Sequence, residues 1–434
     1  MWFIPAAMTF TAMVTAFLLI SVDSLSPENT SLNWLVYSGN PTGARAILST
    51  IAASIITIAG VAFSLNLVIL TIASSQYGPR LLKNFIRDTG NQIVLGTFLS
   101  TFVYSLIVLL AIRDEQEPPF VPHIAVAFSF FLALASLGLL IYFINHTSSS
   151  IQAEHVITSA YEDLVKAINE FVPQQVERQE QLPIEEVISS LECEGYNLCR
   201  LTTPHSGYIQ AFSHKTLWAS SSEQDLVIRL LYQVGDFIVA GECIIDVYSK
   251  DELTPAVKNR ILASVITGVQ RTPAQEIEFP INQMTEIAIR ALSPGVNDPH
   301  TAITCIHWLG SALVMLATNT LPQDIQYDTD NRLRIIRKVH DFSQLVDFCF
   351  DTIRFHAAGN VYVSIHILKS LRKVIQQAKS PAQITALVNL AEVVERSNRE
   401  RVFEQKELHI LTNEYEKLRA DARAFEVPPD VRPQ

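Results

Sequence analysis

Charged side chains are scarce in the first third of this 434-residue sequence. The sequence has 32 Lys/Arg and 43 Asp/Glu residues. Residues 1–150 contain five of the basic and six of the acidic residues, so charged residues make up about 7% of that segment. The remaining 27 and 37 make up about 23% of residues 151–434, close to the roughly 25% of soluble globular chains. This imbalance excludes a single soluble domain, and the hydrophobic content of 49% excludes a disordered chain.

Cysteines, basic runs and catalytic motifs are also few or missing. The five cysteines include no CxxC pair, which excludes a disulfide scaffold, a zinc ribbon and a redox pair. A net charge of −11 without a basic run argues against nucleic-acid binding. No P-loop, GxGxxG, GxSxG or HExxH motif is present, and His300 and His307 share a helical face without a third metal ligand. We therefore expect no catalytic residue, metal or cofactor, and an enzyme is the least favoured class.

Four long apolar stretches account for the low charge of the first third. They cover residues 3–21, 46–78, 93–112 and 121–145, and a helix needs about 20 apolar residues to cross a bilayer core. Because the core offers no water to backbone groups, each stretch should be helical. A cleaved signal peptide is the alternative for the first stretch, but its flank lacks a positive charge. The sequence predicts a four-helix transmembrane domain over residues 1–146.

The loops between these stretches predict the orientation. The second loop carries Arg80, Lys83 and Arg87, and short loops rich in Lys and Arg stay on the cytoplasmic side. Both termini and everything beyond residue 145 then lie in the cytoplasm of a bacterial cell, with the spans in the inner membrane. The cysteines agree, because all five fall in the predicted cytosolic part, where thiols stay reduced.

One face of the second stretch is lined with hydroxyl groups. Steps of four and three residues place Thr50, Ser54, Thr57, Ser64, Thr71 and Ser75 on this face, while Asn66 lies off it. We take Ser54, Thr57, Ser64, Asn66 and Thr71 as candidate functional residues. The face has two interpretations, the lining of a pore or a contact between helices. No Asp, Glu, Lys or Arg stands inside a span, which argues against a coupled transporter.

The cytosolic part is expected to have an α+β fold in three segments. Residues 147–194 form an amphipathic stalk helix and a linker at 173–183. Residues 195–250 show short alternating strands at 208–212, 226–231, 237–239 and 244–247, separated by glycine turns. This segment resembles half of the small barrel of lipoyl and biotinyl carriers, but it has no carrier lysine, so we expect a structural β-barrel-like subdomain. Residues 251–425 are mainly helical, and 426–434 form a disordered tail. The expected helices cover 254–269, 275–292, 300–318, 343–357, 360–378, 382–398 and 401–424, with a short strand at 333–336.

The densest local information lies in residues 271–302, RTPAQEIEFPINQMTEIAIRALSPGVNDPHTA. The sequence SPGVND ends one helix, and Asp298 followed by Pro299 is typical of the next helix start. Asp298 is therefore interpreted either as a helix cap or as part of a site for a small ligand at that start. Arg271, Gln275, Glu276 and Arg290 are expected to form a polar network, structural or functional. The candidate residues of this region are Arg271, Gln275, Glu276, Arg290, Asn297, Asp298, His300 and Thr301.

Three blocks of the sequence resemble the DUF2254 family of uncharacterised predicted bacterial membrane proteins. They are WFIPAAM near the start, residues 63–99 and the 271–302 region. The family pattern has Asp where Glu276 stands and Gly where Pro280 stands. The resemblance implies four spans followed by a cytosolic domain, and it implies no activity.

Three hypotheses for function follow. The first is a homo-oligomeric membrane protein whose second helices pack around an axis and form a pore or channel. The second is a membrane-anchored cytosolic sensor or scaffold that binds a small ligand or a partner protein. The third, an enzyme, requires a cleft that brings together Glu276, Arg290, Asn297, Asp298 and His300. The expected partners are the lipid bilayer and further copies of the chain, without nucleic acid.

Overall fold

The structure is a computed structural model that describes residues 3–25, 40–78, 88–113, 120–150, 152–172 and 183–426. The described chain divides into two compact units, Met1–Val156 and Ile157–Gln434, which we call the N-terminal unit and the C-terminal unit. All but the last residue of the predicted linker at 173–183, and all but the first residue of the predicted tail at 426–434, lie outside the described residues.

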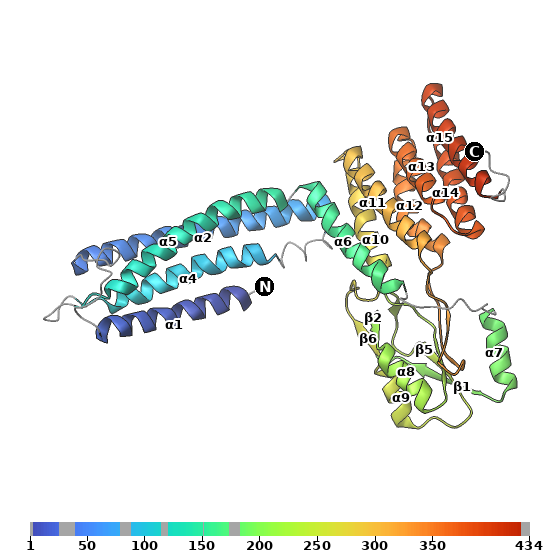
Figure 1. Ribbon diagram of the computed structural model, residues 1–434, viewed down its shortest axis with the longest axis horizontal. Helices are drawn as coiled ribbons and strands as arrows, with labels where there is room; N and C mark the ends of the chain where they lie inside the picture. The colour runs from blue at the N-terminus through green and yellow to red at the C-terminus, as the bar shows by residue number, and fades with distance from the viewer. Residues whose placement is uncertain are drawn as a thin grey trace. The chain divides into compact units, whose positions relative to one another are not determined.

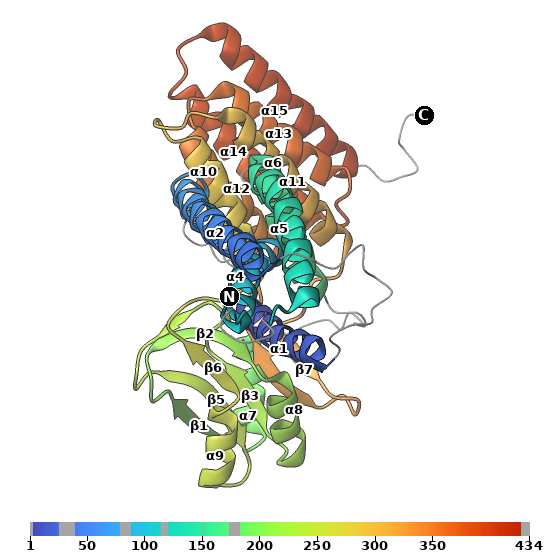
Figure 2. The same ribbon diagram turned by 90° about the vertical axis from the view of Figure 1, so that its left-hand side faces the viewer.

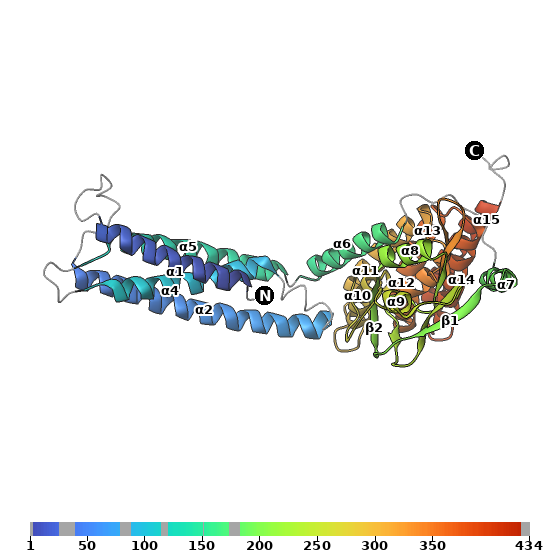
Figure 3. The same cartoon turned by 90° about the horizontal axis from the view of Figure 1, so that it is seen from below.

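Four long helices build the N-terminal unit (Figure 1). They are α1 (Phe3–Leu25), α2 (Pro41–Tyr77), α4 (Thr89–Ala111) and α5 (His123–Ser150). Helix α4 contacts the other three, and Figure 3 shows the same helices running side by side. Side-chain caps mark two of the starts, because Asn40 accepts a hydrogen bond from the Gly43 N–H and Asp88 accepts one from the Gly90 N–H.

The interior of this bundle contains small and aromatic residues, while its outer surface is apolar. Ala59 and Ala62 of α2 are buried against α4 and α5, and the Tyr104 hydroxyl donates to the carbonyl of Ala125 across 3.0 Å. Large apolar side chains instead point outward, including Phe10, Phe17, Leu67, Leu110, Phe130, Phe131, Ile141 and Ile144. A water-soluble bundle would bury such residues, so this surface suits lipid.

Polar contacts lie at the two ends of the bundle. At one end the Asp23 carboxylate, near the end of α1, accepts hydrogen bonds from the backbone N–H groups of Ile124 and Ala125 at 3.1–3.2 Å. At the other end Asp88 and His146 are 2.7 Å apart, and Tyr142 stacks on His146. The charged groups of the bundle therefore join helix ends.

Five described helices are long and apolar enough to cross a membrane by length and composition alone. Four are the helices of the N-terminal unit, and the fifth is α11 (Pro299–Thr318). Helix α11 lies in the C-terminal unit, where Leu309, Leu313 and Leu316 are fully buried and the helix contacts α10, α12 and α13.

Two open sheets form one part of the C-terminal unit (Figure 2). The larger sheet has the order β1 (Asn197–Thr202), β5 (Cys243–Ser249), β3 (Val227–Leu230), β8 (Leu333–Arg337) and β7 (Ile325–Tyr327). Its β3 and β8 are parallel, and its other pairs are antiparallel. The smaller sheet has the order β4 (Phe237–Ile238), β2 (Gly207–Phe212) and β6 (Val265–Gly268).

The expectation of a small β-barrel-like subdomain at residues 195–250 is wrong, because the strands of this segment belong to two open sheets. Helices α8 (His214–Glu223) and α9 (Pro255–Leu262) supply Leu217 and Ile261 to the core on one face of the strands. Helix α7 (Ile184–Cys193) packs Val187 and Leu191 against the larger sheet with Val227 and Tyr248. The larger sheet therefore lies as a layer between helices, and it continues beyond β3 into β8 and β7, which come from beyond residue 250. The expected strands at 208–212, 226–231, 237–239, 244–247 and 333–336 are confirmed within one or two residues.

Helices make up the other part of this unit. They are α6 (Ala153–Phe171), which begins at the unit boundary, α10 (Glu278–Ala291), α11, α12 (Phe342–Ala357), α13 (Val361–Ile375), α14 (Pro381–Arg399) and α15 (Gln405–Glu426). The expected helices from residue 275 onward are confirmed within a few residues. The expected helix over 254–269 is too long, because α9 ends at Leu262 and the β-branched run Val265, Ile266 and Thr267 pairs with β2 instead.

Candidate functional site

The turn between α10 and α11 is a helix cap. The Asp298 carboxylate accepts from the Thr301 N–H at 3.2 Å and from the Thr301 hydroxyl at 2.6 Å, and Pro299 is the first helical residue. The Thr301 hydroxyl is the main reason that the pKa of Asp298 lies below its usual value. Asn297 adopts a positive φ of 49° to make the turn. The structure therefore bears out the cap interpretation.

Two further candidates of this region, His300 and Arg290, contact other side chains of the C-terminal unit. His300 lies edge-on to the Tyr362 ring of α13 at 5.8 Å between centroids. Arg290 binds Glu286, one turn earlier in α10, at 3.1 Å.

Arg271 and Glu276 form a buried ion pair just before α10. Glu276 is 3% exposed, and Arg271 donates to it from Nε at 2.9 Å. A second nitrogen of Arg271 contacts Glu276 and also Glu278. Burial by itself lowers the pKa of Arg271, but its bonds to the two carboxylates raise that pKa above the usual value. Gly235 (φ +98°) closes over this pair, and a Cβ there would lie 2.8 Å from the Glu276 carboxyl carbon.

Gln275 connects the same segment to the smaller sheet. Its side chain accepts from the Phe212 N–H at 3.1 Å and donates to the Phe212 carbonyl at 3.2 Å. Gln275 has a positive φ of 57°, a strained conformation for a residue other than glycine. The two hydrogen bonds hold the residues that precede α10 against the end of β2.

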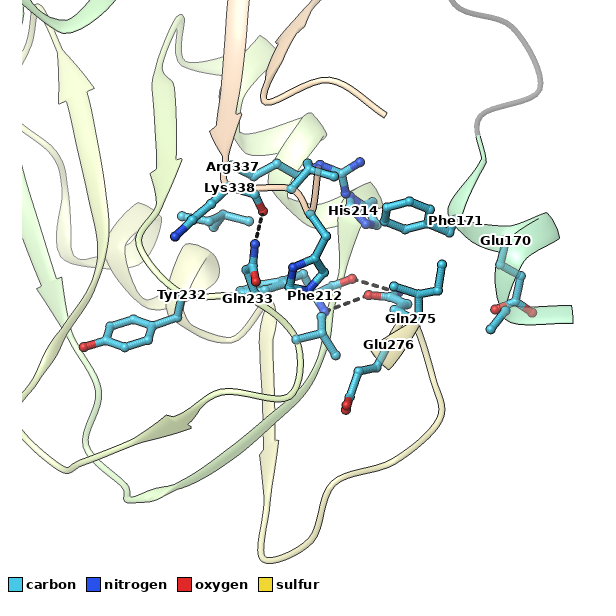
Figure 4. A pocket seen from close by; sticks show the side chains of 16 residues that line it. Glu170, Phe171, Phe212, His214, Tyr232, Gln233, Gln275, Glu276, Arg337 and Lys338 are labelled. Carbon is cyan, nitrogen blue, oxygen red and sulfur yellow. Dashed lines mark hydrogen bonds between the residues drawn. The ribbon is translucent and has the colours of Figure 1, made fainter. Parts of the chain in front are cut away.

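A cavity of about 290 Å³ lies beside this connection (Figure 4). Its walls come from five segments of the C-terminal unit. These are α6, the end of β2 with the start of α8, β3 with the following loop, residues 275–277, and the end of β8 with the following loop. The polar lining residues are Glu170, His214, Tyr232, Gln233, Gln275, Glu276, Arg337, Lys338 and His340. The apolar lining residues are Ala167, Phe171, Phe212, Leu230, Val234, Ile277 and Val339.

Arg337 is the charged centre of the cavity. Its Nε is buried without a hydrogen-bond partner, and burial lowers the pKa of its guanidinium, an effect that Asp324 partly opposes. Figure 4 shows the guanidinium directed toward His214. Burial and the charge of Arg337 both lower the pKa of His214. His214 is therefore held in its neutral form next to a fixed positive charge.

His340 is the second histidine of the cavity. Its Nδ1 is buried without a hydrogen-bond partner, and its ring packs edge-on against Phe348 at 5.0 Å. Burial lowers its pKa, while Glu278 and Gln344 partly oppose this effect. Across the described residues, no group of three or more His, Cys, Asp or Glu side chains is placed to hold a metal ion.

The cavity brings together residues that the sequence did not single out. Of the eight candidates in residues 271–302, Gln275 and Glu276 line it. Of the five residues that an active-site cleft would need, Glu276 alone lines it, and Asp298 is used as a cap. Phe171, His214 and Arg337 come from distant segments, and no local spacing signals their meeting. The one available signal is an arginine directly after the predicted strand at 333–336.

The hydroxyl face of α2 lies on the outside of the N-terminal unit. Ser54, Thr57, Ser64 and Thr71 are exposed, and Asn66 is half-buried. The hydroxyls of Thr57, Ser64 and Thr71 donate to backbone carbonyls of α2 itself, at 2.8–2.9 Å. The opposite face, with Ala52, Ala59 and Ala62, makes the contacts with α4 and α5.

Comparison with known proteins places this chain among uncharacterised membrane proteins. The chain is 31% identical over 408 residues to uncharacterized proteins of Mycobacterium bovis and of two strains of Mycobacterium tuberculosis. The matches cover 92% of this chain and 75% of each relative. No solved structure matches the chain. Residues 1–373 match the family described as "Predicted membrane protein (DUF2254)", and the chain therefore belongs to the DUF2254 family.

Proposed function

We propose that the protein is a membrane-anchored sensor whose C-terminal unit binds a small molecule in the Arg337 cavity. The observation that carries this proposal is the cavity itself, a concave site in which apolar side chains and convergent polar groups line the same space. Ionisable groups with shifted pKa values gather at such functional sites, and the pKa values of Arg337, His214 and His340 are all lowered by burial there.

The proposed anchor has four spans, α1, α2, α4 and α5, in a bacterial inner membrane. The outward apolar side chains of these helices support this arrangement. Helix α11 is excluded from the spans because its apolar residues fill the core of the C-terminal unit. The basic loop with Arg80, Lys83 and Arg87 supports cytoplasmic termini, and the five cysteines of the C-terminal unit are free thiols, as in a reducing compartment.

The test is a cavity-filling variant of the full-length protein in lipid nanodiscs. Thermal unfolding is measured against a library of small metabolites, and a ligand of the cavity raises the midpoint. Ala167→Phe places a ring where Ala167 lines the cavity, and Ala420→Phe makes the same change at an exposed helix position. The proposal expects the wild type and Ala420→Phe to respond to the same compounds and Ala167→Phe to lose the response. An equal response from Ala167→Phe contradicts it.

A second proposal concerns the hydroxyl face of α2. Ser54, Thr57, Ser64 and Thr71 of this face are exposed in the described part of the chain, and small hydroxylated residues allow close contact between membrane helices. It therefore supports a homo-oligomer around α2, with or without a pore. Ser64→Leu should weaken association, measured as particle mass across detergent concentrations, whereas Phe63→Leu on an exposed neighbouring position should not. If the wild type is monomeric at all concentrations, the homo-oligomer proposal is wrong. If Ser64→Leu leaves the conductance in planar bilayers unchanged, the pore proposal is wrong.

A further inference from the structure

Arg337, whose Nε is buried, differs from two other arginines of the C-terminal unit that are shielded from water, Arg271 and Arg334. Arg334 binds Asp328 at 2.7 Å and Asp225 at 2.8 Å, and Arg271 likewise contacts two carboxylates. No carboxylate of the described residues forms such an ion pair with Arg337, and its Nε lacks a hydrogen-bond partner. Asp324 offsets the cost of burying the Arg337 guanidinium only in part, and a bound anion in direct contact with the guanidinium would reduce that cost further.

The acidic groups near Arg337 are engaged elsewhere. Asp324 accepts a hydrogen bond from the Val339 N–H at 2.8 Å. Glu276 binds Arg271, and Figure 4 shows its carboxylate pointing away from Arg337. Glu170 is exposed on α6. The positive charge of the cavity is therefore directed toward whatever occupies it.

Size and wall chemistry restrict the occupant further. The cavity volume of about 290 Å³ lies at the lower end of the roughly 300–1,000 Å³ that is usual for small-molecule sites, which suits a small organic molecule. Phe171, Phe212 and Ile277 offer it an apolar surface. Two cationic side chains line the cavity, Arg337 and Lys338. Lys338 is exposed to solvent, so Arg337 is the cation that is withdrawn from water, and its neighbour His214 has a lowered pKa. A single guanidinium matches a single carboxylate, which it binds through two parallel hydrogen bonds.

We infer that the cavity binds a small organic monocarboxylate, with the carboxylate on Arg337 and an apolar body against Phe171 and Ile277. This inference rests on the proposed function, because it names the ligand class of the same cavity. The His214 ring, next to the guanidinium, is placed to donate one further N–H to the carboxylate. Arg337 is then a ligand-binding residue. The free-energy cost of removing its guanidinium from water is offset when the carboxylate of the ligand binds to it.

The experiment compares an acid with its neutral isostere on the full-length protein in nanodiscs. Phenylacetate, phenylacetamide, acetate and inorganic phosphate are titrated by calorimetry. Phenylacetate is expected to bind at least about tenfold more tightly than phenylacetamide, because a hydrogen bond to a charged group is worth about 1.5–3 kcal/mol. Acetate should be weaker than phenylacetate because it lacks the apolar body.

Variants of the arginine assign the effect to its side chain. Arg337→Gln should weaken the binding of phenylacetate at least about tenfold and leave the binding of phenylacetamide unchanged. The affinity of Arg337→Lys for phenylacetate should lie between those of the wild type and Arg337→Gln. Arg332→Gln is the matched control, since it removes an arginine that is 63% exposed on the turn before β8. Arg337→Gln removes a charge whose burial Asp324 offsets only in part, so the unfolding midpoint of the variant should not fall, which separates lost binding from lost folding.

The outcomes separate this inference from the proposed function. Equal affinity for phenylacetate and phenylacetamide, with both lost in Ala167→Phe, overturns the carboxylate and keeps the cavity as a binding site. Phosphate binding that exceeds phenylacetate binding, or an Arg337→Gln variant that binds phenylacetate like the wild type, also overturns the carboxylate. Failure of all four probes to bind overturns it too, while a response of the cavity to other compounds in the metabolite screen keeps the proposed function.

Discussion

Loss of Arg271 should unfold the C-terminal unit at a markedly lower temperature. Arg271→Gln leaves the Glu276 carboxylate, whose side chain is 2% exposed, without its cation. Removing one partner of a buried ion pair costs about 3–5 kcal/mol, and because a quarter of the Arg271 side chain reaches water, we expect about 3 kcal/mol. Domains of 150–250 residues lose about 2–4 °C per kcal/mol, so the midpoint should fall by about 6–12 °C.

Two buried thiols provide the assay for this change. Cys305 and Cys349 are fully buried in the C-terminal unit, so a fluorescent maleimide reacts with them only when the unit opens. Cys193 is exposed and Cys199 and Cys243 are half-buried, so these three thiols are replaced by serine in every variant before labelling. The midpoint is read on full-length protein in nanodiscs while the temperature rises.

Two comparisons decide whether the reasoning holds. Arg260→Gln removes an arginine from an exposed pair with Glu223, and such pairs contribute less than about 1 kcal/mol. The double variant Arg271→Gln with Glu276→Gln removes the buried charge as well and should recover most of the loss. The explanation is refuted if Arg271→Gln behaves like Arg260→Gln, or if the second substitution adds a further loss.

Three other perturbations have defined outcomes. Gly235→Ala should destabilise the unit by about 1–3 kcal/mol in the same thermal assay, because φ is +98° and the new methyl would meet the Glu276 carboxyl group. Asp298→Ala should lose about 1 kcal/mol through the missing cap, and Asp298→Asn should restore most of it. The folded-state pKa values of His214 and His340 are lowered below 6.5, so the unfolded chain binds more protons and stability should fall as pH drops through about 6.5. Replacing both histidines with Gln should reduce this dependence to the part that comes from His307 and His366, whose pKa values are also lowered, and an unchanged slope contradicts it.

Local chemistry made parts of the fold predictable. The Asp298–Pro299 pair predicts a cap because both residue types satisfy needs of a helix start, and α11 begins there. The glycines at 235 and 241 predict turns because glycine tolerates positive φ angles. Both residues adopt such angles in the structure. Long uncharged stretches likewise predict the four helices of the N-terminal unit, since their length and polarity are set by the bilayer.

Features that depend on distant contacts were not predictable. Strands bounded by glycine look the same in a closed barrel and in an open sheet, so the pairing of β3 with β8 had no signal before residue 333. The Arg337 cavity has the same origin, because Phe171, His214 and Arg337 meet only after the sheet and α6 are assembled. The helix expected over 254–269 failed because pairing with β2 outweighed helical periodicity at Val265.

The carboxylate of Asp23 also has a consequence for the N-terminal unit. It supplies the acceptors for the first amide groups of α5, about 100 residues later in the chain. An amide that is shielded from water and has no acceptor is destabilising, so the start of α5 depends on a side chain of α1. Helix α1 therefore contributes hydrogen-bond acceptors as well as packing to the bundle.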